Sequence, residues 1–313
     1  MIIGIDPKVD YVFKRLFGRE QNAPLLIHLL NAILQFQPGS RIASLQILNP
    51  FHDKENLDDK LSVLDIKARD ESGRLFNIEM QMLAYGPFRT RVLYYWAKLY
   101  QGQMLEGMQY EELHPAISIC FVNTPLYPEV PAHHLVFELR ERRHAMVFTD
   151  HLQVHILELA KFKLRGDQLA APEDPWLYFL CHGDELDTEA LPAALELPEI
   201  HKALGEMKML TKDQLELERY ESRLKMKRDM YAALKEAQTQ GLTEGLTEGR
   251  AEGRAEGRAE GQKEGKIERI HGWQRFLRQQ PTPAEQLMIR SIEELEAMAQ
   301  SLERDAANLR VGL

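Results

Sequence analysis

The sequence predicts an α/β fold followed by a mainly helical C-terminal region. The predicted elements run helix, helix, strand, hairpin, helix, strand, which is the pattern of an α/β domain. Beyond residue 164, strand-like runs give way to charged, helix-forming sequence. The chain has 313 residues, of which 44% are hydrophobic and 28% charged, so it is long enough to bury a substantial core.

Two helices and a strand are predicted at the N-terminus. Asp6-Pro7 has the composition of an N-cap followed by proline in the first turn, and apolar residues then recur at helical spacing until Gly18. Residues 23–36 form a second helical stretch, which Pro38-Gly39 ends. Residues 41–48 are typical of a strand.

A β-hairpin is predicted next, after a polar loop. The strand-like runs at residues 61–70 and 74–83 flank Glu71-Ser72-Gly73, the composition of a tight turn in which the glycine takes a positive φ. The second run alternates between apolar and polar residues, which indicates one apolar face. The polar face carries Asn77, Glu79 and Gln81.

One helix and three strands complete the predicted α/β domain. Pro87 opens a helix that runs to about residue 105. Residues 115–123 are apolar or small and predict a strand buried on both faces, while residues 134–139 and 145–157 are further strand candidates. The expected buried stripe of the helix consists of Val92, Leu93, Trp96, Leu99 and Tyr100.

Four segments are expected along the chain. They are an α/β domain at residues 1–165, a helical region at 166–236, a four-residue repeat at 237–266 and a helical tail at 267–313. The tail is expected to form two helices broken at Pro281-Thr-Pro283.

The repeat places seven glycines four residues apart, from Gly241 to Gly265. In a helix each glycine costs about 1 kcal/mol relative to alanine, or on the order of 7 kcal/mol together, so such a helix is weak by itself. Arg250, Arg254 and Arg258 lie two or six residues from the repeat's glutamates and make no i,i+3 or i,i+4 pairs with them. One hypothesis is a homo-oligomer in which glycines allow close approach and charged rows pair between chains. The alternative is a flexible linker.

Composition excludes several classes of protein. No apolar run approaches the roughly 18 residues that a membrane helix needs, so no membrane association is expected. The formal charge of -9 argues against a generally basic nucleic-acid binder but leaves room for a local basic groove. Two cysteines make neither a disulfide framework nor a cysteine-rich zinc site, and we expect a cytoplasmic protein with reduced thiols.

The hairpin turn determines which side chains face each other. A three-residue loop pairs Asp70 with Arg74, which places Lys67 opposite Asn77 and Asp65 opposite Glu79. Two directly opposed carboxylates repel each other, and a shared Mg²⁺ ion is an economical way to compensate. The alternative is a solvated strand face on which Lys67 screens the acids, because a shift of one residue in register would separate the two carboxylates.

These residues resemble a known family. Leu64-Asp65-Ile66, followed by Gly73 to Gln81, is similar to the core motif of the PD-(D/E)XK nuclease-like transposases, also called recombination-promoting nucleases. The similarity extends to Asp10-Tyr-Val-Phe-Lys14 and to Arg91-Val-Leu-Tyr-Tyr95, and it covers roughly residues 5–130.

The resemblance implies a restriction-endonuclease-like core, with a mixed sheet flanked by helices, and a magnesium-dependent DNA endonuclease acting in recombination or transposition. It implies that Asp65 and Glu79 are metal ligands for Mg²⁺, with Mn²⁺ as a possible substitute. Gln81 would stand where the wider superfamily has a catalytic lysine; a neutral amide can orient a water molecule but supplies no charge. Lys67 or Lys60 is the candidate for the missing charge.

Further site residues are expected on two helices. Lys14, with Asp10 in support, would approach the metal site or DNA, or else form a simple i,i+4 ion pair. Arg91, Tyr95 and Lys98 share a helix face, which we expect to point away from the apolar stripe and to contact DNA phosphates.

Two other functions stay open. One is a catalytically weak or inactive nuclease-fold protein that acts as an oligomeric scaffold for DNA or protein; the neutral Gln81 and the acidic net charge favour it. The other is a glycoside hydrolase that uses paired carboxylates, which is weaker because the sequence indicates no aromatic-lined sugar cleft.

Overall fold

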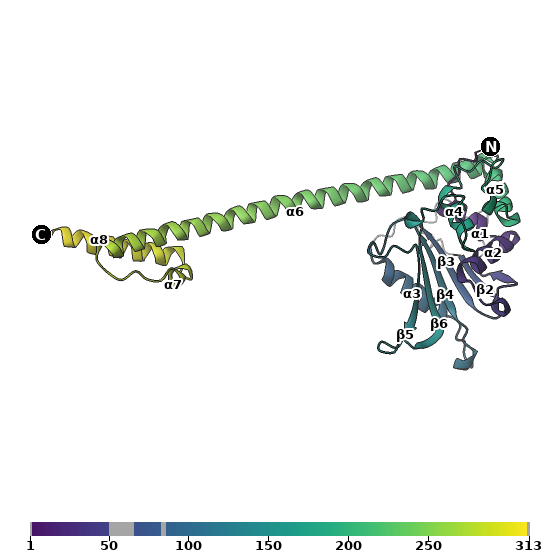
Figure 1. The fold of residues 1–313 in the computed structure, drawn as a ribbon, viewed down its shortest axis with the longest axis horizontal. Coiled ribbons are helices and arrows are strands. Elements are labelled where there is room, and N and C mark those ends of the chain that lie inside the picture. The colour runs from purple at the N-terminus through teal and green to yellow at the C-terminus, as the bar shows by residue number, and fades with distance from the viewer. Residues whose placement is uncertain (1, 50–65, 83–85, 312–313) are drawn as a thin grey trace. The chain divides into compact units, whose positions relative to one another are not determined.

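The computed structural model describes residues 2–49, 66–82 and 86–311 (Figure 1). Its residues form two compact units, Met1–Arg228 and Asp229–Leu313. The first unit holds the sheet and the second is helical. The four segments expected from the sequence stay a prediction.

A mixed six-stranded sheet forms the centre of the first unit within the described residues, in the order β1-β2-β3-β4-β6-β5. Strands β3, β4 and β6 are mutually parallel, and the remaining neighbours pair antiparallel. Together with the flanking helices, this sheet confirms the predicted fold class. The strands are β1 Leu45–Ile47, β2 Ile66–Asp70, β3 Leu75–Gln81, β4 Ala116–Val122, β5 His134–Arg140 and β6 Val147–Glu158.

The β2–β3 hairpin has the predicted register, with Lys67 opposite Asn77. Gly73 takes the expected positive φ of 90°. Asp70 holds the turn, because its Oδ1 accepts the N–H groups of Ser72 and Arg74 at 3.0 and 2.9 Å. A turn stabilised in this way sets the register of the strands that it joins.

One face of the sheet carries the main core. There Phe76, Ile78 and Met80 of β3 pack with helices from both ends of the unit. Phe13 of α1 lies between Phe17 and Phe121, with ring centroids 4.9 and 5.6 Å away. The helices that contribute to this core are α1 Asp10–Phe17, α2 Ala23–Leu34, α4 Asp174–His182 and α5 Pro198–Leu210.

Helix α3, Phe88–Gln101, covers the opposite face (Figure 1). Its Phe88 and Val92 pack against Cys120 of β4 and Ile156 of β6. Trp96 Nε1 donates a hydrogen bond to the Ala116 carbonyl at 2.7 Å. The predicted burial of Leu93 is wrong, since this side chain is 52% exposed. The surface of α3 that contacts the sheet is narrower than the apolar stripe of the helix.

Several element boundaries differ from the prediction. Helix α1 begins at Asp10 and not directly after Asp6, because the Asp6 carboxylate accepts the Lys8 N–H at 2.8 Å and so stabilises a separate turn. Helix α2 ends at Leu34 because Gln35 adopts a left-handed conformation with φ 46°. Short 3₁₀ turns occur at Glu20–Asn22, Pro38–Ser40, Tyr110–Glu112, Leu159–Lys161 and Ala193–Leu195.

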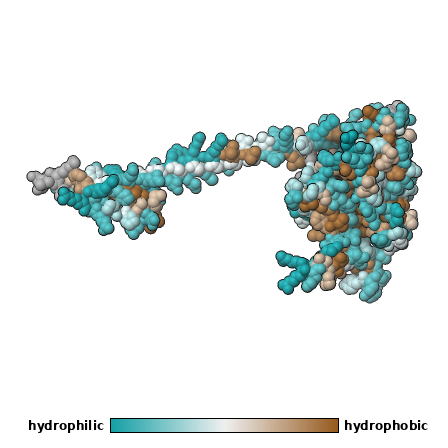
Figure 2. Space-filling model, in the orientation of Figure 1, coloured by the Kyte–Doolittle hydropathy of each residue, from teal (hydrophilic) through white to brown (hydrophobic). Residues whose placement is uncertain are grey.

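Helix α6, Gln214–Phe276, is 63 residues long and runs without interruption through the glycine repeat. At its start, Glu216 accepts hydrogen bonds from Tyr11 and Arg15 of α1. The space-filling view shows mostly hydrophilic and near-neutral residues along the repeat (Figure 2). None of the glycines from Gly241 to Gly265 has a heavy atom from outside its own helical turn within 4 Å of the position of an added Cβ.

The end of α6 forms a small helical core with α7, Ala284–Met288, and α8, Ile292–Val311. Helix α6 ends at Phe276 and α7 begins at Ala284, so the predicted Pro281-Thr-Pro283 break lies within the non-helical segment between them, and a second break separates α7 from α8. The buried residues of this core are Ile267, Ile270, Leu287, Leu295 and Ala299. Among the described residues no helix is both long and apolar enough to span a membrane.

Candidate functional site

Glu79 lies near the C-terminal end of β3, on the sheet face covered by α3. Its β4 partner Cys120 packs against Phe88 and Val92 of that helix. Glu79 and Asn77 are each only 3% exposed. The alternative of a solvated strand face is therefore wrong for both, because β4 and α3 enclose them. A buried carboxylate requires compensating charge or hydrogen bonds, so its position is structurally costly.

The predicted partners Asp65 and Lys60 lie outside the described residues. The nearest described pair is Ile66 with Ile78, and it has the register that the turn predicts. The facing of Asp65 and Glu79 stays a prediction that rests on one further step of this register.

Two buried polar atoms accompany Glu79 on the same face. Asn77 and Ser118 are neighbours across β3 and β4, and they are 3% and 0% exposed. Within the described part of the chain, neither Asn77 Oδ1 nor Ser118 Oγ has a hydrogen-bond partner. Buried groups of this kind are ordinarily satisfied by ordered water or a ligand. Sequence reasoning missed Ser118, because a single small residue in an apolar strand carries no visible signal.

The charged face of α3 differs from the prediction. Arg91 and Tyr95 are half-buried and only Lys98 is exposed, so these three residues do not all point away from the sheet. The Nη2 atom of Arg91 is buried, and its guanidinium lies 5.5 Å from the centre of the Phe88 ring. Arg89 on the same helix stacks instead on Tyr127, which itself contacts Phe137 of β5. Helical geometry puts Arg91 on the flank opposite Arg89, because two residues span about 200° of the helix.

Helix α1 brings Lys14 next to the start of β2. Lys14 is 4% exposed. A Cβ atom added at Gly18 would lie 3.1 Å from Lys14 Cγ and 3.5 Å from Ile66 Cγ1, which shows how closely this helix end approaches β2. Asp10 accepts the Tyr11 N–H at 2.8 Å. Burial lowers the pKa of Lys227, which lies near Asp10, to about 8.

The remaining predicted residues, Lys67 and Gln81, are both half-buried. The Lys67 N–H donates to Asn49 Oδ1 at 2.6 Å, which ties β2 to the segment after β1. The Gln81 carbonyl accepts the N–H of Asn123 at 3.1 Å. Gln81 therefore lies at the edge where the carboxyl ends of the parallel strands meet, the usual location of ligand sites in such sheets.

The donor set fits a hard divalent cation. Mg²⁺ favours oxygen ligands and commonly takes only one or two protein carboxylates, with water completing the shell. Glu79 supplies a carboxylate and Gln81 an amide oxygen at the same strand end. Among the described residues no three histidine, cysteine, aspartate or glutamate side chains form a metal-binding cluster, and the predicted second carboxylate, Asp65, lies beyond them.

Comparison with known proteins identifies one family. A model of the PD-(D/E)XK nuclease family transposases matches residues 7–237, which is more than half of the chain. The matched region includes the whole sheet and ends within α6, before the first glycine of the repeat. No curated protein and no solved structure matches the chain.

Proposed function

This chain belongs to the PD-(D/E)XK nuclease family transposases, and on that premise we propose that it is a metal-dependent DNA endonuclease acting in recombination or transposition. The observation that carries the proposal is the burial of Glu79 at the C-terminal end of β3. Burying a carboxylate there would serve no purpose in a simple surface hairpin, but it suits a ligand that must hold a cation.

Asp65 and Glu79 would hold Mg²⁺, with Mn²⁺ as a substitute. When bound, such an ion lowers the pKa of a coordinated water molecule and stabilises the charge that develops on a phosphodiester. The described register of β2 and β3 supports this assignment, since one more pair in the same register joins residues 65 and 79.

Gln81 would orient the attacking water, because its amide both donates and accepts hydrogen bonds. The positive charge that glutamine lacks would come from Lys67 or Lys60. Lys67 is half-buried and, by the alternation of β2, shares the sheet face of Asn77 and Glu79.

Helices α1 and α3 would supply the DNA contacts. Lys98 is exposed and Tyr95 half-buried, so both are accessible to a phosphate backbone. Arg91 has a buried Nη2 atom and Lys14 is 4% exposed, so they would act on a phosphate that has entered the site, with Asp10 supporting α1.

Plasmid cleavage in Mg²⁺ or Mn²⁺ tests the proposal. Asp65→Asn and Glu79→Gln keep the side-chain shape but remove the ligand charge, and each should reduce the cleavage rate by at least about 100-fold. Glu106→Gln is the matched control. Glu106 is exposed and follows α3 in the sequence, so this variant should cleave normally. Equal cutting by all four proteins would contradict the proposal.

A second candidate function is a catalytically weak scaffold that binds DNA or protein through the nuclease fold. The neutral Gln81 favours it, because it removes a charge that an efficient hydrolase would use. DNA binding without any metal-dependent cleavage by the unaltered protein would support the scaffold over the nuclease.

The repeat in α6 would join copies of the chain into a homo-oligomer. Its glycines leave the helix surface open, and within the described residues Arg250, Arg254 and Arg258 have no ion-pair partner. Rows of like charge along one helix can be neutralised by the rows of another copy, while glycines allow the helix axes to approach closely.

A further inference from the structure

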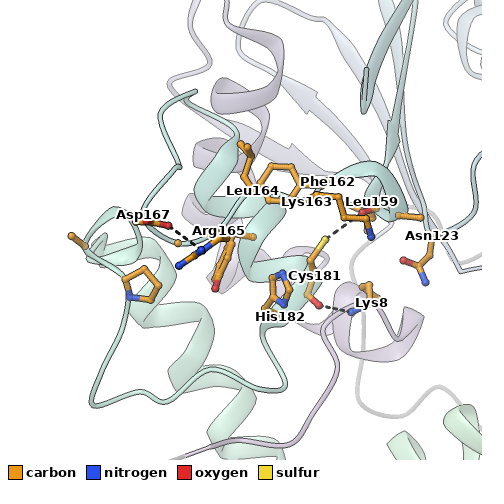
Figure 3. Close-up of a pocket in the computed structure, with 15 residues that line it drawn as sticks. Lys8, Asn123, Leu159, Phe162, Lys163, Leu164, Arg165, Asp167, Cys181 and His182 are labelled. Carbon is orange, nitrogen blue, oxygen red and sulfur yellow. Dashed lines mark hydrogen bonds and ion pairs between the residues drawn. The ribbon is translucent and has the colours of Figure 1, made fainter. Parts of the chain in front are cut away.

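A pocket of about 930 Å³ opens at the carboxyl edge of the sheet in the first unit. It is lined by Asn123, which follows β4, by the segment after β6 and by the end of α4. Figure 3 shows Asn123 and Lys8 on one side, Arg165 and Asp167 on the other, and Cys181 with His182 between them.

The pocket and the candidate site share the carboxyl edge of the sheet. The Asn123 N–H donates to the carbonyl of Gln81, so the pocket wall is bonded to the strand that carries Glu79. Both features lie where the parallel strands β3, β4 and β6 end. Glu79 faces the α3 side of the sheet and the pocket lies on the α4 side, so a DNA strand that reaches Glu79 meets the pocket by crossing this carboxyl edge.

The negative end of α4 beside the pocket would repel a bound anion, and Lys8 offsets this charge. The last carbonyl groups of a helix carry partial negative charge, and here α4 ends beside the pocket. Lys8 Nζ donates to the carbonyls of Leu180 and Cys181, each at 3.1 Å, and binds Asp6 at 3.0 Å. Lys8 thus offsets the helix end.

The thiol in the floor is not a nucleophile. Cys181 Sγ lies 3.7 Å from the Leu159 carbonyl oxygen, and burial raises the pKa of its thiol to about 11. The Cys181 thiol therefore stays protonated near neutral pH and offers no thiolate to the pocket.

The pocket wall carries two cationic side chains and two ring side chains. Lys163 is exposed and makes no ion pair within the described residues. Arg165 pairs with Asp167 at 3.6 Å, but their side chains are 80% and 72% exposed, so the pair is weak. The rings of Tyr178 and His182 lie 4.6 Å apart and both line the pocket.

We propose that this pocket holds one unpaired nucleotide of the DNA strand next to the cleavage site. Lys163 and Arg165 contact its phosphate, and its base packs against Tyr178 and His182. The inference rests on the proposed nuclease function. A concave pocket admits a base only when that base has left the duplex stack, and stacking on aromatic side chains accepts any base.

Fluorescence anisotropy of the full chain in EDTA, where no cleavage occurs, tests this inference. The probes are a labelled duplex with a central unpaired bubble and the same duplex fully paired. The unaltered protein should bind the bubble more tightly. Lys163→Ala with Arg165→Ala should abolish that preference and lower the slope of log K against log salt by about 0.7, the value for one phosphate contact on a single strand. Tyr178→Leu should weaken bubble binding about tenfold.

The control removes equal charge elsewhere, as Arg142→Ala with Lys212→Ala, two exposed cations that do not line the pocket. It should keep the bubble preference, and thermal unfolding should be equal in both double variants. If the pocket variant binds like the control, the inference is wrong while the nuclease proposal stands. If the unaltered protein binds neither probe, both fail. Tight binding of free thymidine monophosphate, equal to that of the bubble, would also overturn the inference.

Discussion

The sheet unit and the glycine repeat bury their residues to opposite extents. In the sheet unit Phe13 is 1% and Glu79 3% exposed, whereas in the repeat Leu242 and Leu246 are 74% and 55% exposed. The sheet unit owes its geometry to its own core, so a site there can be complete within one chain. The repeat has no core, so any specific role must come from something that lies against it.

Ion pairing also differs between the glycine repeat and the packed helices that follow it. At the end of the repeat Lys266 pairs with Glu296, and beyond it Arg269 pairs with Glu296 and Glu303. Within the repeat, Arg258 Nε donates to the Arg254 carbonyl of its own helix and to no other group among the described residues. Charge pairing resumes where α8 packs on α6, so among the described residues the arginines of the repeat have no ion-pair partner.

The largest expected effect compares one apolar residue from each region. Phe13→Ala should lower the free energy of unfolding by about 3–5 kcal/mol, because it leaves a cavity among Phe17 and Phe121. Leu246→Ala should change it by less than about 0.5 kcal/mol, since that side chain is exposed. Urea unfolding of the full chain measures both, and equal losses would show that the repeat packs on something in solution.

Replacing glycines of the repeat with alanine should stabilise the α6 helix but weaken association between copies of the chain. Replacing Gly249, Gly253 and Gly257 with alanine should stabilise the α6 helix by about 3 kcal/mol in total, because an added Cβ meets no neighbour. If glycines allow close approach between copies, the same variant should associate more weakly. Circular dichroism on heating and sedimentation velocity separate the two quantities.

Two outcomes of that experiment count against self-association through the glycines. One is a variant that associates as well as the unaltered protein. The other is an unaltered protein that sediments as a monomer at every concentration, which would favour the linker hypothesis.

The sequence predicted local geometry best where short-range chemistry determines it. The hairpin register followed from the three-residue turn, because the hydrogen bonds to Asp70 and the positive φ of Gly73 fix the turn and therefore the pairing of the two strands. The all-buried character of β4 followed from its unbroken apolar run. Such features depend on neighbours within a few residues.

Features that depend on packing between segments far apart in the chain could not be predicted from the sequence. The burial of Glu79 depends on β4, which pairs with β3, and on α3, which packs on the same sheet face; both come together only in the folded sheet. Leu93 lies on the apolar stripe of α3 but has no surface to meet. Asp6 has the composition of a helix cap, yet its contacts with Lys8 compete with that role. Asp65 lies outside the described residues, so its part of the site stays a prediction.

A pH-dependent effect comes from the place where α6 meets the sheet unit. Lys227 Nζ donates to the Lys8 carbonyl, and burial lowers its pKa from 10.5 to about 8 despite nearby Asp10 and Asp6. Between these values the unfolded chain binds the proton and the folded chain does not, so the contribution of Lys227 to stability, taken relative to Lys227→Met, should rise from about pH 8 to 10.5. The gain should be about 2 kcal/mol, allowing for partial exposure.

The matched variant for this effect is Lys227→Met, which keeps an unbranched side chain without a titrating group. Its stability should not rise over the same pH interval, as measured by urea unfolding at several pH values. An unchanged rise in this variant would assign the effect to another group.

The smallest expected effect concerns the buried hydroxyl of Ser118, which separates structural from functional burial inside the sheet unit. Because Ser118 Oγ has no hydrogen-bond partner among the described residues, Ser118→Ala should change the free energy of unfolding by less than about 1 kcal/mol and can even raise it. Thr149→Ala, which removes a hydroxyl that accepts the His151 N–H at 3.2 Å, is the comparison and should be destabilising. A loss above about 1 kcal/mol for Ser118→Ala would mean that ordered water satisfies the hydroxyl. In that case the polar face beside Glu79 is hydrated, as water-assisted hydrolysis requires.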